Sequence, residues 1–409
     1  MTPTYVSFTQ YRELALHILI IHNYYQQPGG EDLVFASEMK LLEENGHTVT
    51  KYTLHNDAVT DLSKWALAKN TLWNHTSYRE IRVLIQKVQP DIVHVHNTFM
   101  LISPSVYYAA KSVRIPVVQT LHNFRLLCPA SNLYRDQKIC EDCLSKFIPW
   151  PAAIHRCYRK SRLQTLGVIA MLTFHRWCHT WQRQIDIYIA LTEFARTKFI
   201  EGGLPPDKIV VKPNFTFPDP GLKRSRGRYA LFVGRLTEEK GLMTMIESWH
   251  KLDAIPLKIV GDGPLKKKLA HYVDNERMHA VELLGYNSHE QTIEYMKSAS
   301  FLVFPSQWYE GFPMTISEAF ACGLPVIAAR LGAMAEIVEH EYTGLLFDAN
   351  CRTDLSKKVH WAWDHPDLME QMGRNARREY QQKYMPEKNY QELLSIYLKV
   401  TGSRNASGE

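Results

Sequence analysis

The chain contains 409 residues, of which 45% are hydrophobic and 22% are charged, proportions that are ordinary for a globular enzyme. A chain of this length exceeds a single ordinary core, so we expect two domains. The formal net charge of +6 at pH 7 suits anionic nucleotides or an anionic membrane surface and is too small to indicate a nucleic-acid partner. Because the sequence shows neither a long apolar span nor an N-terminal signal peptide, we expect a cytoplasmic protein.

The first half of the chain alternates between short apolar stretches and stretches with helical spacing. One helical stretch, residues 31–45, has apolar residues at Leu33, Phe35, Met39 and Leu42. Strands that alternate with helices predict a parallel, doubly wound sheet. The predicted strands of this first set are 17–22, 48–53, 91–95, 116–121 and 186–190.

Two adjacent glycines, Gly29 and Gly30, lie between the first predicted strand and the helix that follows it. A glycine-rich loop in this position is a candidate phosphate-binding loop, because the free amides of a helix N-terminus attract anions. The next residue, Glu31, has two interpretations. It is either a polar group that binds an acceptor or a first-turn glutamate favoured by the helix dipole.

Histidines follow two of the predicted strands. His94 and His96 come at the end of the strand at 91–95, and His122 follows the strand at 116–121 in the segment Thr-Leu-His-Asn-Phe-Arg. Because ligands bind at the carboxyl ends of parallel strands, we expect His122 to face the cleft and the other two to shape its floor.

Four of the seven cysteines fall within one insert, residues 124–162. The spacing contains a Cys-x2-Cys pair and favours a closed, structural four-cysteine zinc site. An iron–sulfur cluster and unliganded buried thiols are the alternatives, since disulfides are not expected in a reducing compartment. The four candidate ligands are Cys128, Cys140, Cys143 and Cys157.

The insert leads into a predicted helix at 163–183 with many apolar residues beside a basic segment. A basic amphipathic helix can lie on an anionic bilayer, at the inner face of a membrane, and the acceptor would then be lipid-linked. The alternative is a core helix of the first domain with a solvated end. The basic residues are Arg156, Arg159, Lys160, Arg162 and Arg176.

A stretch rich in proline, glycine and charge, 213–227, is typical of a linker. It divides a predicted first domain, 1–212, from a second one, 228–385, with a helical segment and tail at 386–409. The strands predicted for the second domain are 228–234, 256–261, 281–285, 300–305 and 325–329. We therefore expect two Rossmann-like domains that face each other across a cleft.

The loops that follow these later strands carry charge and glycine. Arg235 and Lys240 flank the segment Leu-Thr-Glu-Glu after the strand at 228–234, and Gly261 and Gly263 follow the strand at 256–261. Glycine supplies positive φ angles and permits close backbone approach. Tyr286 follows the strand at 281–285.

The segment 305–328 places two carboxylates, Glu310 and Glu318, on either side of a Gly-Phe-Pro turn that opens a helix. Pro313 suits a first helical position, and the free amides of the turn would bind a phosphate. Carboxylates accept hydrogen bonds from hydroxyl groups. Together these groups predict a sugar-nucleotide site.

The Gly-Arg-x4-Lys-Gly and Glu-x7-Glu patterns resemble those of retaining family 4 glycosyltransferases (glycosyltransferase group 1), which have the two-domain GT-B fold. The resemblance implies that the C-terminal helix packs back on the first domain. It also implies a UDP- or GDP-sugar donor and a hexosyltransferase-type activity that produces glycans or glycolipids.

The resemblance further implies a role for each site residue. Arg235 and Lys240 would bind the donor diphosphate, Glu318 the ribose, and Glu310 and His122 the donor sugar. The glycine pairs would lie beside the nucleotide, Tyr286 would lie near its base, and Glu31 would lie on the acceptor side. The remaining donor-binding residues are Gly311, Phe312, Pro313 and Met314.

No Asp-x-Asp motif follows a strand, so a catalytic metal is not indicated, and Arg235, Lys240 and helix dipoles would stabilise the leaving group. In the family, the leaving phosphate assists deprotonation of the acceptor. A sugar-nucleotide epimerase or phosphorylase of the same architecture is the alternative enzyme. A zinc-containing nucleic-acid or scaffold protein is disfavoured by the ordinary charge.

Overall fold

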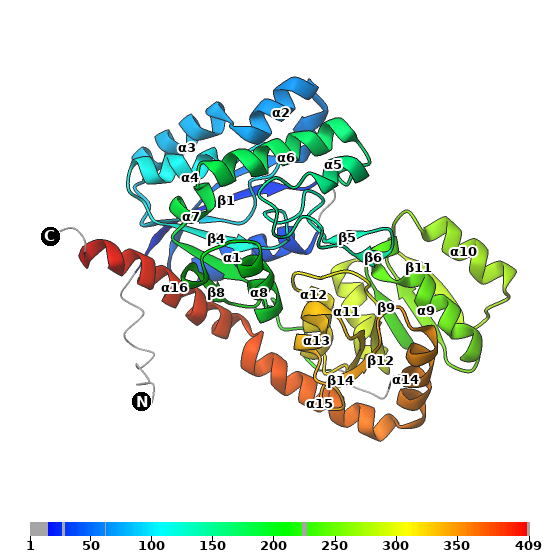
Figure 1. Ribbon diagram of the computed structural model, residues 1–409. Helices are drawn as coiled ribbons and strands as arrows, with labels where there is room; N and C mark the ends of the chain where they lie inside the picture. Colours follow the sequence, from blue (N-terminus) through cyan, green and yellow to red (C-terminus); the bar gives the residue numbers. More distant parts are fainter. Residues whose placement is uncertain (1–14, 27–28, 62, 223–226, 407–409) are drawn as a thin grey trace.

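The computed structural model describes residues 15–26, 29–61, 63–222 and 227–406. These residues form two α/β domains, each built around one six-stranded parallel sheet, and a long helix that returns from the second domain to the first (Figure 1). The predicted α/β class with two doubly wound sheets is confirmed.

The first sheet has the strand order β2-β1-β3-β4-β7-β8. Five of these strands lie where the sequence predicted them. The sixth, β8, has three residues, too few to leave a recognisable pattern. The strands are β1 (His17–Tyr24), β2 (Thr48–His55), β3 (Ile92–Val95), β4 (Val117–Leu121), β7 (Ile187–Ala190) and β8 (Ile209–Val211).

Side chains of successive strand residues point to opposite faces of this sheet. Leu19 and Ile21 of β1 join a core with helices α3, α4, α6 and α8, whereas Ile18 joins a separate core on the opposite face. The helices of the first domain are α1 (Gly30–Glu44), α2 (Lys64–Leu72), α3 (His75–Val88), α4 (Ser105–Ser112), α5 (Pro151–His155), α6 (Arg162–Trp177), α7 (Thr180–Arg183) and α8 (Glu193–Glu201).

The opposite face of the first sheet is covered by α16 (Pro386–Ala406), drawn in red in Figure 1. Leu393, Leu394 and Tyr397 of this helix are buried against Ile18 and Ile92 of the sheet. The C-terminal helix therefore belongs to the core of the first domain, as the sequence predicted. Residues 407–409 of the predicted tail lie outside the described residues.

The second sheet has the order β11-β10-β9-β12-β13-β14. Its strands are β9 (Ala230–Val233), β10 (Leu257–Val260), β11 (Val281–Gly285), β12 (Phe301–Phe304), β13 (Val326–Ala329) and β14 (Gly344–Phe347). Its helices are α9 (Leu242–Ser248), α10 (Lys266–Asn275), α11 (His289–Ser298), α12 (Met314–Ala321), α13 (Gly332–Ile337), α14 (Arg352–Asp364) and α15 (Pro366–Lys383).

The structure corrects one expectation about the connecting segments and adds detail to two others. The helix predicted at 163–183 ends at Trp177, because His179 adopts a left-handed backbone conformation with φ of 53° before α7 begins. The predicted linker is partly fixed, since Asn214, Phe215 and Thr216 are buried; its residues 223–226 lie outside the described part. The cysteine-rich insert forms the hairpin β5 (Tyr134–Arg135) and β6 (Lys138–Ile139), and its Leu133 is buried in the first core.

Candidate functional site

The site residues lie where the strand order of each sheet reverses. In the first sheet β1 lies between β2 and β3, and in the second sheet β9 lies between β10 and β12. Loops that follow the two strands at such a point diverge and leave a crevice that ligands occupy. Gly29 and Gly30 follow β1, the segment with Arg235 and Lys240 follows β9, and Glu310 follows β12.

A pocket of about 640 Å³ opens on the second domain. Arg235 is exposed and, among the described residues, none is a hydrogen-bond or ion-pair partner of its guanidinium. The strand-end residues predicted for nucleotide binding thus converge on one pocket, and Thr292 joins them there. Its lining is Val233, Gly234, Arg235, Val260, Gly261, Asp262, Gly263, Pro264, Tyr286, Asn287 and Thr292.

Gly261 and Gly263 allow the walls of this pocket to approach each other. Gly261 has φ of 144°, and a Cβ added there would lie 1.9 Å from the Gly234 carbonyl oxygen. Gly263 has φ of 159°, and an added Cβ would lie 2.6 Å from the Leu236 oxygen. Both positions need glycine for its backbone conformation and for space, as the sequence predicted.

Glu310 and Lys240, predicted separately from two motifs, are in direct contact. The Lys240 ammonium nitrogen lies 2.6 Å from Glu310 Oε1. The same oxygen accepts hydrogen bonds from Ser306 Oγ at 2.6 Å and Trp308 Nε1 at 2.7 Å. Glu310 is buried, so three donors fix one of its oxygens and the position of the lysine. Neither Ser306 nor Trp308 was predicted, since both lie inside the motif without a distinctive pattern.

Glu318 is buried in α12 and meets a residue that the sequence did not indicate. His289 Nε2 lies 3.1 Å from Glu318 Oε1, and this hydrogen bond raises the pKa of His289 above its ordinary value. In the sequence, His289 follows Ser288 at the start of α11 and reads only as part of a helix cap. The pair connects α11 to α12, the helix that follows Glu310.

The turn before α12 differs in detail from the expectation. Pro313 precedes the helix and is not its first residue, and the Ile316 N–H donates to the Pro313 oxygen at 2.9 Å. The amide of Ile316 is therefore not free for a ligand. Gly311 lies against the first domain, because a Cβ added there would come within 2.5 Å of the His122 carbonyl oxygen.

Between the domains lies a cavity of about 160 Å³. It brings together residues predicted from both halves of the chain, including Gly30, Glu31, His122, Glu310, Gly311, Phe312 and Met314. The Gly29 loop is held by Asp32, whose Oδ2 accepts the Gly29 N–H at 2.8 Å. Gly30 packs near Met314 of the second domain.

Glu31 is the acidic group on the first-domain side of this cavity. Its Oε2 accepts hydrogen bonds from Tyr25 Oη at 3.1 Å and from Asn123 Nδ2 at 3.3 Å. Its Oε1 is buried and has no hydrogen-bond partner among the described residues. Burial raises the pKa of Glu31 to about 8, so at neutral pH this carboxyl is mainly protonated and can donate a hydrogen bond.

His122 lines the cavity, and two other histidines lie behind it. His122 Nε2 lies 2.9 Å from His96 Nδ1, and burial lowers the pKa of His122 well below its ordinary value. His94 and His96 are buried, so any part they have in shaping the cleft, as the sequence predicted, is exerted from behind His122.

The four cysteines of the insert are neighbours. All are free thiols, with Cys128 and Cys143 buried. Burial raises the pKa of Cys143 to about 12, and the proximity of Cys128, Cys157 and Cys140 adds to the effect. Across the described residues, the one group of three or more potential metal ligands with all ligand atoms within 4.8 Å of one another is Glu38, His94 and His96. The thiols would therefore have to draw together to close a tetrahedral site.

The insert and α6 carry an exposed apolar surface, here called the α5–α6 patch. It consists of Phe147, Ile148, Trp150, Ile154, Leu163, Leu166 and Trp177. Four of the predicted basic residues lie beside it, but Arg176 does not contribute, because its guanidinium donates to the carbonyl oxygens of Lys146, Phe147 and Leu126. No helix in the described ranges is long and apolar enough to cross a membrane.

Two family models match the chain in succession. The model for Glycosyltransferase Family 4 matches residues 28–219, and the model for glycosyl transferases group 1 matches residues 215–379. The first match contains the first sheet from β2 onwards and the second contains the whole second sheet.

Among curated proteins, an uncharacterized glycosyltransferase of Methanocaldococcus jannaschii is 36% identical over 169 residues, 41% of this chain and 47% of the relative. The D-rhamnosyltransferase WbpZ of Pseudomonas aeruginosa is 30% identical over 159 residues, 38% of this chain and 42% of the relative. The chain thus spans less than half the length of these relatives.

Solved structures with similar folds cover nearly the whole chain. A glycosyltransferase from Rickettsia africae superposes with a TM-score of 0.71 at 18% identity, over 94% of this chain and 98% of that one. The Anabaena protein HepE in complex with UDP-glucose has a TM-score of 0.65 at 18% identity, over 93% and 99%. The fold is GT-B, and with two family models spanning both domains, the chain belongs to the family 4, group 1 glycosyltransferases.

Proposed function

We propose that this protein is a retaining, metal-independent glycosyltransferase that moves a hexose from a nucleoside-diphosphate sugar to a hydroxyl group of a glycan or lipid-linked acceptor. The observation that carries the proposal is the contact between Lys240 and Glu310 at the cavity between the domains. The contact supports the proposal because Lys240 would then stabilise the leaving diphosphate while Glu310, beside it, would orient the sugar. The family models and relatives give no support to an epimerase or a phosphorylase.

The donor would span the pocket of the second domain and the cavity. A base and ribose fit the larger pocket beside Tyr286, and Glu318 would accept hydrogen bonds from ribose hydroxyls. Arg235 has an uncommitted guanidinium that can form two parallel hydrogen bonds to a phosphate. The complex of the Anabaena protein with UDP-glucose supports a UDP-sugar donor, and a GDP-sugar is the second candidate.

The reaction would break the bond between the sugar and the diphosphate. Arg235 and Lys240 stabilise the negative charge that develops on the departing nucleoside diphosphate. The acceptor oxygen attacks from the face that the diphosphate leaves, and its proton passes to a phosphate oxygen. Three donors bind Glu310 Oε1 and draw negative charge from the carboxylate, so we assign Glu310 to orienting the sugar and not to attacking it. Retention then follows from attack and departure on one face.

The acceptor would enter from the first-domain side of the cavity. Within the described part of the chain, Glu31 Oε1 is buried and has no partner, and such an atom costs free energy unless a ligand satisfies it. With a pKa of about 8, the carboxyl would donate to an acceptor hydroxyl oxygen. Asn123, which also lines the cavity, would bind beside it.

The α5–α6 patch is the surface through which the protein would bind an anionic membrane. Trp150 and Trp177 are more than half exposed, at 54% and 72%, and tryptophan suits the interfacial region of a bilayer. Arg162 and Lys160 lie beside the patch, where cations attract anionic lipid headgroups. Exposed apolar side chains flanked by basic ones support a lipid-linked acceptor over a dissolved glycan.

The four cysteines would hold one structural zinc ion. They supply the right donors in the right number, since a four-cysteine site is tetrahedral with Zn–S bonds of about 2.3 Å. Metal analysis should find about one zinc per chain, and EDTA should lower the thermal stability without stopping turnover by protein that stays folded. Neither zinc nor iron in protein prepared under reducing conditions would exclude the site.

The transferase proposal is tested by incubating the protein with UDP- and GDP-sugars, in the presence of EDTA, and following nucleoside diphosphate release and the anomeric configuration of the product. We expect release from one class of donor, with retention, at a rate that Lys240→Ala lowers about 100- to 1,000-fold. Lys258→Ala, a surface lysine paired with Glu282, is the matched control and should leave the rate unchanged. Release that requires added Mg²⁺ or Mn²⁺ would contradict the metal-independent mechanism.

A further inference from the structure

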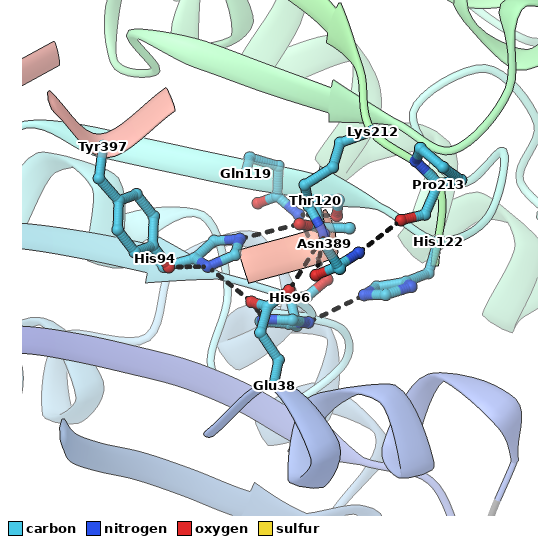
Figure 2. Close-up of polar contacts among 10 residues, drawn as sticks. All are labelled: Glu38, His94, His96, Gln119, Thr120, His122, Lys212, Pro213, Asn389 and Tyr397. Atoms are coloured by element: carbon cyan, nitrogen blue, oxygen red, sulfur yellow. Dashed lines mark hydrogen bonds and ion pairs between the residues drawn. The ribbon is translucent and has the colours of Figure 1, made fainter. Parts of the chain in front are cut away.

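Behind His122 lies a buried network of polar side chains that the mechanism above does not use (Figure 2). Glu38 of α1 is at its centre. Its Oε1 lies 3.0 Å from His96 Nε2 and 3.0 Å from His94 Nδ1, and its Oε2 lies 3.4 Å from the Lys212 ammonium. The network extends to α16, because His94 Nδ1 is 2.7 Å from Tyr397 Oη and Lys212 is 3.0 Å from Asn389 Oδ1.

The protonation state of Glu38 sets the direction of the hydrogen bonds. Although burial opposes ionisation, Lys212, His94 and His96 hold the pKa of Glu38 well below its ordinary value. An ionised carboxylate can only accept hydrogen bonds. The proton between Glu38 and His96 therefore lies on His96 Nε2.

This assignment fixes the next two nitrogens. Burial lowers the pKa of His96 to about 4, so the ring is neutral and carries one proton. Since that proton is on Nε2, His96 Nδ1 is an acceptor. It can accept only from His122 Nε2, which lies 2.9 Å away. His122 must then carry its proton on Nε2.

The remaining nitrogen of His122 is available to a ligand. Burial also keeps His122 neutral by lowering its pKa, so Nδ1 carries a lone pair. Among the described residues none is a hydrogen-bond partner of Nδ1, and this atom is not one of the buried unpaired atoms. The residue lines the cavity that also contains Glu310.

We propose that Glu38 and His96 are positioning residues, which hold His122 as the Nε2–H tautomer so that its Nδ1 accepts a hydrogen bond from a hydroxyl group of the transferred sugar. The identity of the ligand as a sugar rests on the proposed function. The tautomer does not, because it follows from contacts within the protein. Glu38 thus acts on the sugar site through two rings, without touching the ligand.

A metal ion is the competing explanation for Glu38, His94 and His96, whose ligand atoms lie within 4.8 Å of one another. The Lys212 ammonium already supplies a positive charge to Glu38 and would repel a divalent cation. His96 Nδ1 and His94 Nε2 are also hydrogen-bonded, to His122 and to Thr120 Oγ1 at 2.8 Å. A hydrogen-bonded network accounts for every contact of the group.

The tautomer can be measured directly by nuclear magnetic resonance of protein labelled with ¹⁵N in its histidines, without substrate. The His122 signals are assigned by their loss in His122→Asn. We expect a protonated Nε2 and an unprotonated Nδ1 at neutral pH. His175 is an internal reference, since its Nε2 faces the Leu72 carbonyl oxygen at 2.9 Å and does not depend on Glu38. A His122 ring protonated on Nδ1 would overturn the proposal even if the protein transfers sugar.

Variants of His96 test the positioning role. His96→Phe preserves the ring but offers no acceptor, so His122 should populate both tautomers and kcat should fall about tenfold, the effect of one hydrogen bond, with little change in the KM for the donor. His96→Asn, which returns an oxygen acceptor near Nδ1, should recover part of kcat and of the Nε2–H signal.

The matched control is His175→Gln, a second buried histidine of the first domain. It should leave both kcat and the His122 signals unchanged. An unaltered His122 tautomer in folded His96→Phe, or an equal loss of kcat in His175→Gln, would show that the network acts only through packing and would overturn the positioning role. If His96→Phe does not fold, the tautomer of His122 measured in the wild type, and the kcat and His122 signals of His96→Asn, still test the positioning role.

Discussion

The two domains contribute different kinds of side chain to the cleft. In the second domain, Arg235, Lys240 and Glu318 come from short contiguous motifs and present charge near an open pocket. In the first domain, His122 is neutral and depends on buried partners from distant parts of the chain, including Glu38 and Lys212. Charge suits the binding of an anion, whereas a buried hydrogen-bonded network fixes orientation.

The largest effect should follow loss of charge from the second half. Lys240→Ala removes a cation that stabilises the leaving group, so kcat should fall about 100- to 1,000-fold. Glu310→Gln should lower kcat less, because Ser306 and Trp308 can still donate to the remaining carbonyl oxygen, and it should barely change the affinity for nucleoside diphosphate. Initial rates at saturating donor concentration measure kcat of the two variants. A kcat equal to that of the wild type in Lys240→Ala would contradict the proposal that charge from the second domain stabilises the leaving group.

A smaller effect is expected at Glu318, where only binding is involved. Glu318→Ala removes charged hydrogen bonds to the ribose, each worth about 1.5–3 kcal/mol, so the Kd for nucleoside diphosphate should rise at least tenfold. Calorimetric titration measures it, with Glu294→Ala on the exposed side of α11 as the control. Equal losses of nucleoside diphosphate affinity in Glu318→Ala and Glu310→Gln would contradict the division of roles between the two glutamates.

The burial of the Glu31 carboxyl in the first domain can be tested through the pH dependence of the free energy of unfolding. Its pKa is about 8 in the folded protein against an ordinary value of 4.5, so between these values the folded chain binds more protons and stability falls as pH rises. Glu31→Gln keeps an acceptor for Tyr25 and Asn123 without this titration. It should be more stable than wild type by about 5 kcal/mol near pH 9, because each unit of pKa difference is worth about 1.4 kcal/mol, with the difference shrinking toward about pH 5.

Thermal unfolding at several pH values measures this difference. Glu276→Gln, at an exposed glutamate of the second domain, is the control and should show no such trend. If Glu31→Gln and wild type kept the same stability difference at every pH, the carboxyl would be ionised in the folded protein and could not donate to an acceptor.

The smallest effect concerns the surface of the first domain. Arg162→Gln removes one exposed cation beside the α5–α6 patch, so partitioning onto anionic vesicles should weaken by about 1 kcal/mol, roughly fivefold. Arg330→Gln, at an exposed arginine of the second domain, should have no effect. Flotation assays with anionic vesicles at low salt measure the binding of both variants. If the wild-type protein does not float, the membrane proposal is wrong, and α6 is a packed helix of a protein that acts on a dissolved acceptor.

The contrast between the halves also explains what the sequence could predict. Strands and the loops that follow them were found because apolar runs and glycine are local signals. Arg235, Lys240, Glu310 and Glu318 were found because each motif lies within one loop and helix start. Arg235 lines the pocket and Glu310 lines the cavity, since both follow parallel strands whose carboxyl ends share one edge of a sheet.

Other features required the three-dimensional structure. Glu38 lies on α1 with no local feature that distinguishes it from a surface glutamate, and Lys212 and Asn389, which meet at 3.0 Å, are separated by the whole second domain. The contact of His289 with Glu318 was missed because, in the sequence, His289 is only the residue after a helix cap. The break after Trp177 was missed because the left-handed residue is His179, and not the glycine or asparagine that usually marks such a position.

The position of α16 also constrains how the protein is made. Its residues Leu393 and Tyr397 complete a core that otherwise consists mainly of strand residues of the first domain, together with Leu42 of α1. A ribosome adds about 5–20 residues per second, so the roughly 180 residues between Val211 and Leu393 delay that completion by roughly 10–40 s. During this interval the nascent first domain exposes one apolar face of its sheet. Folding of the first domain can finish only after the second domain has been synthesised. In that interval a chaperone that binds apolar strands would bind the nascent first domain.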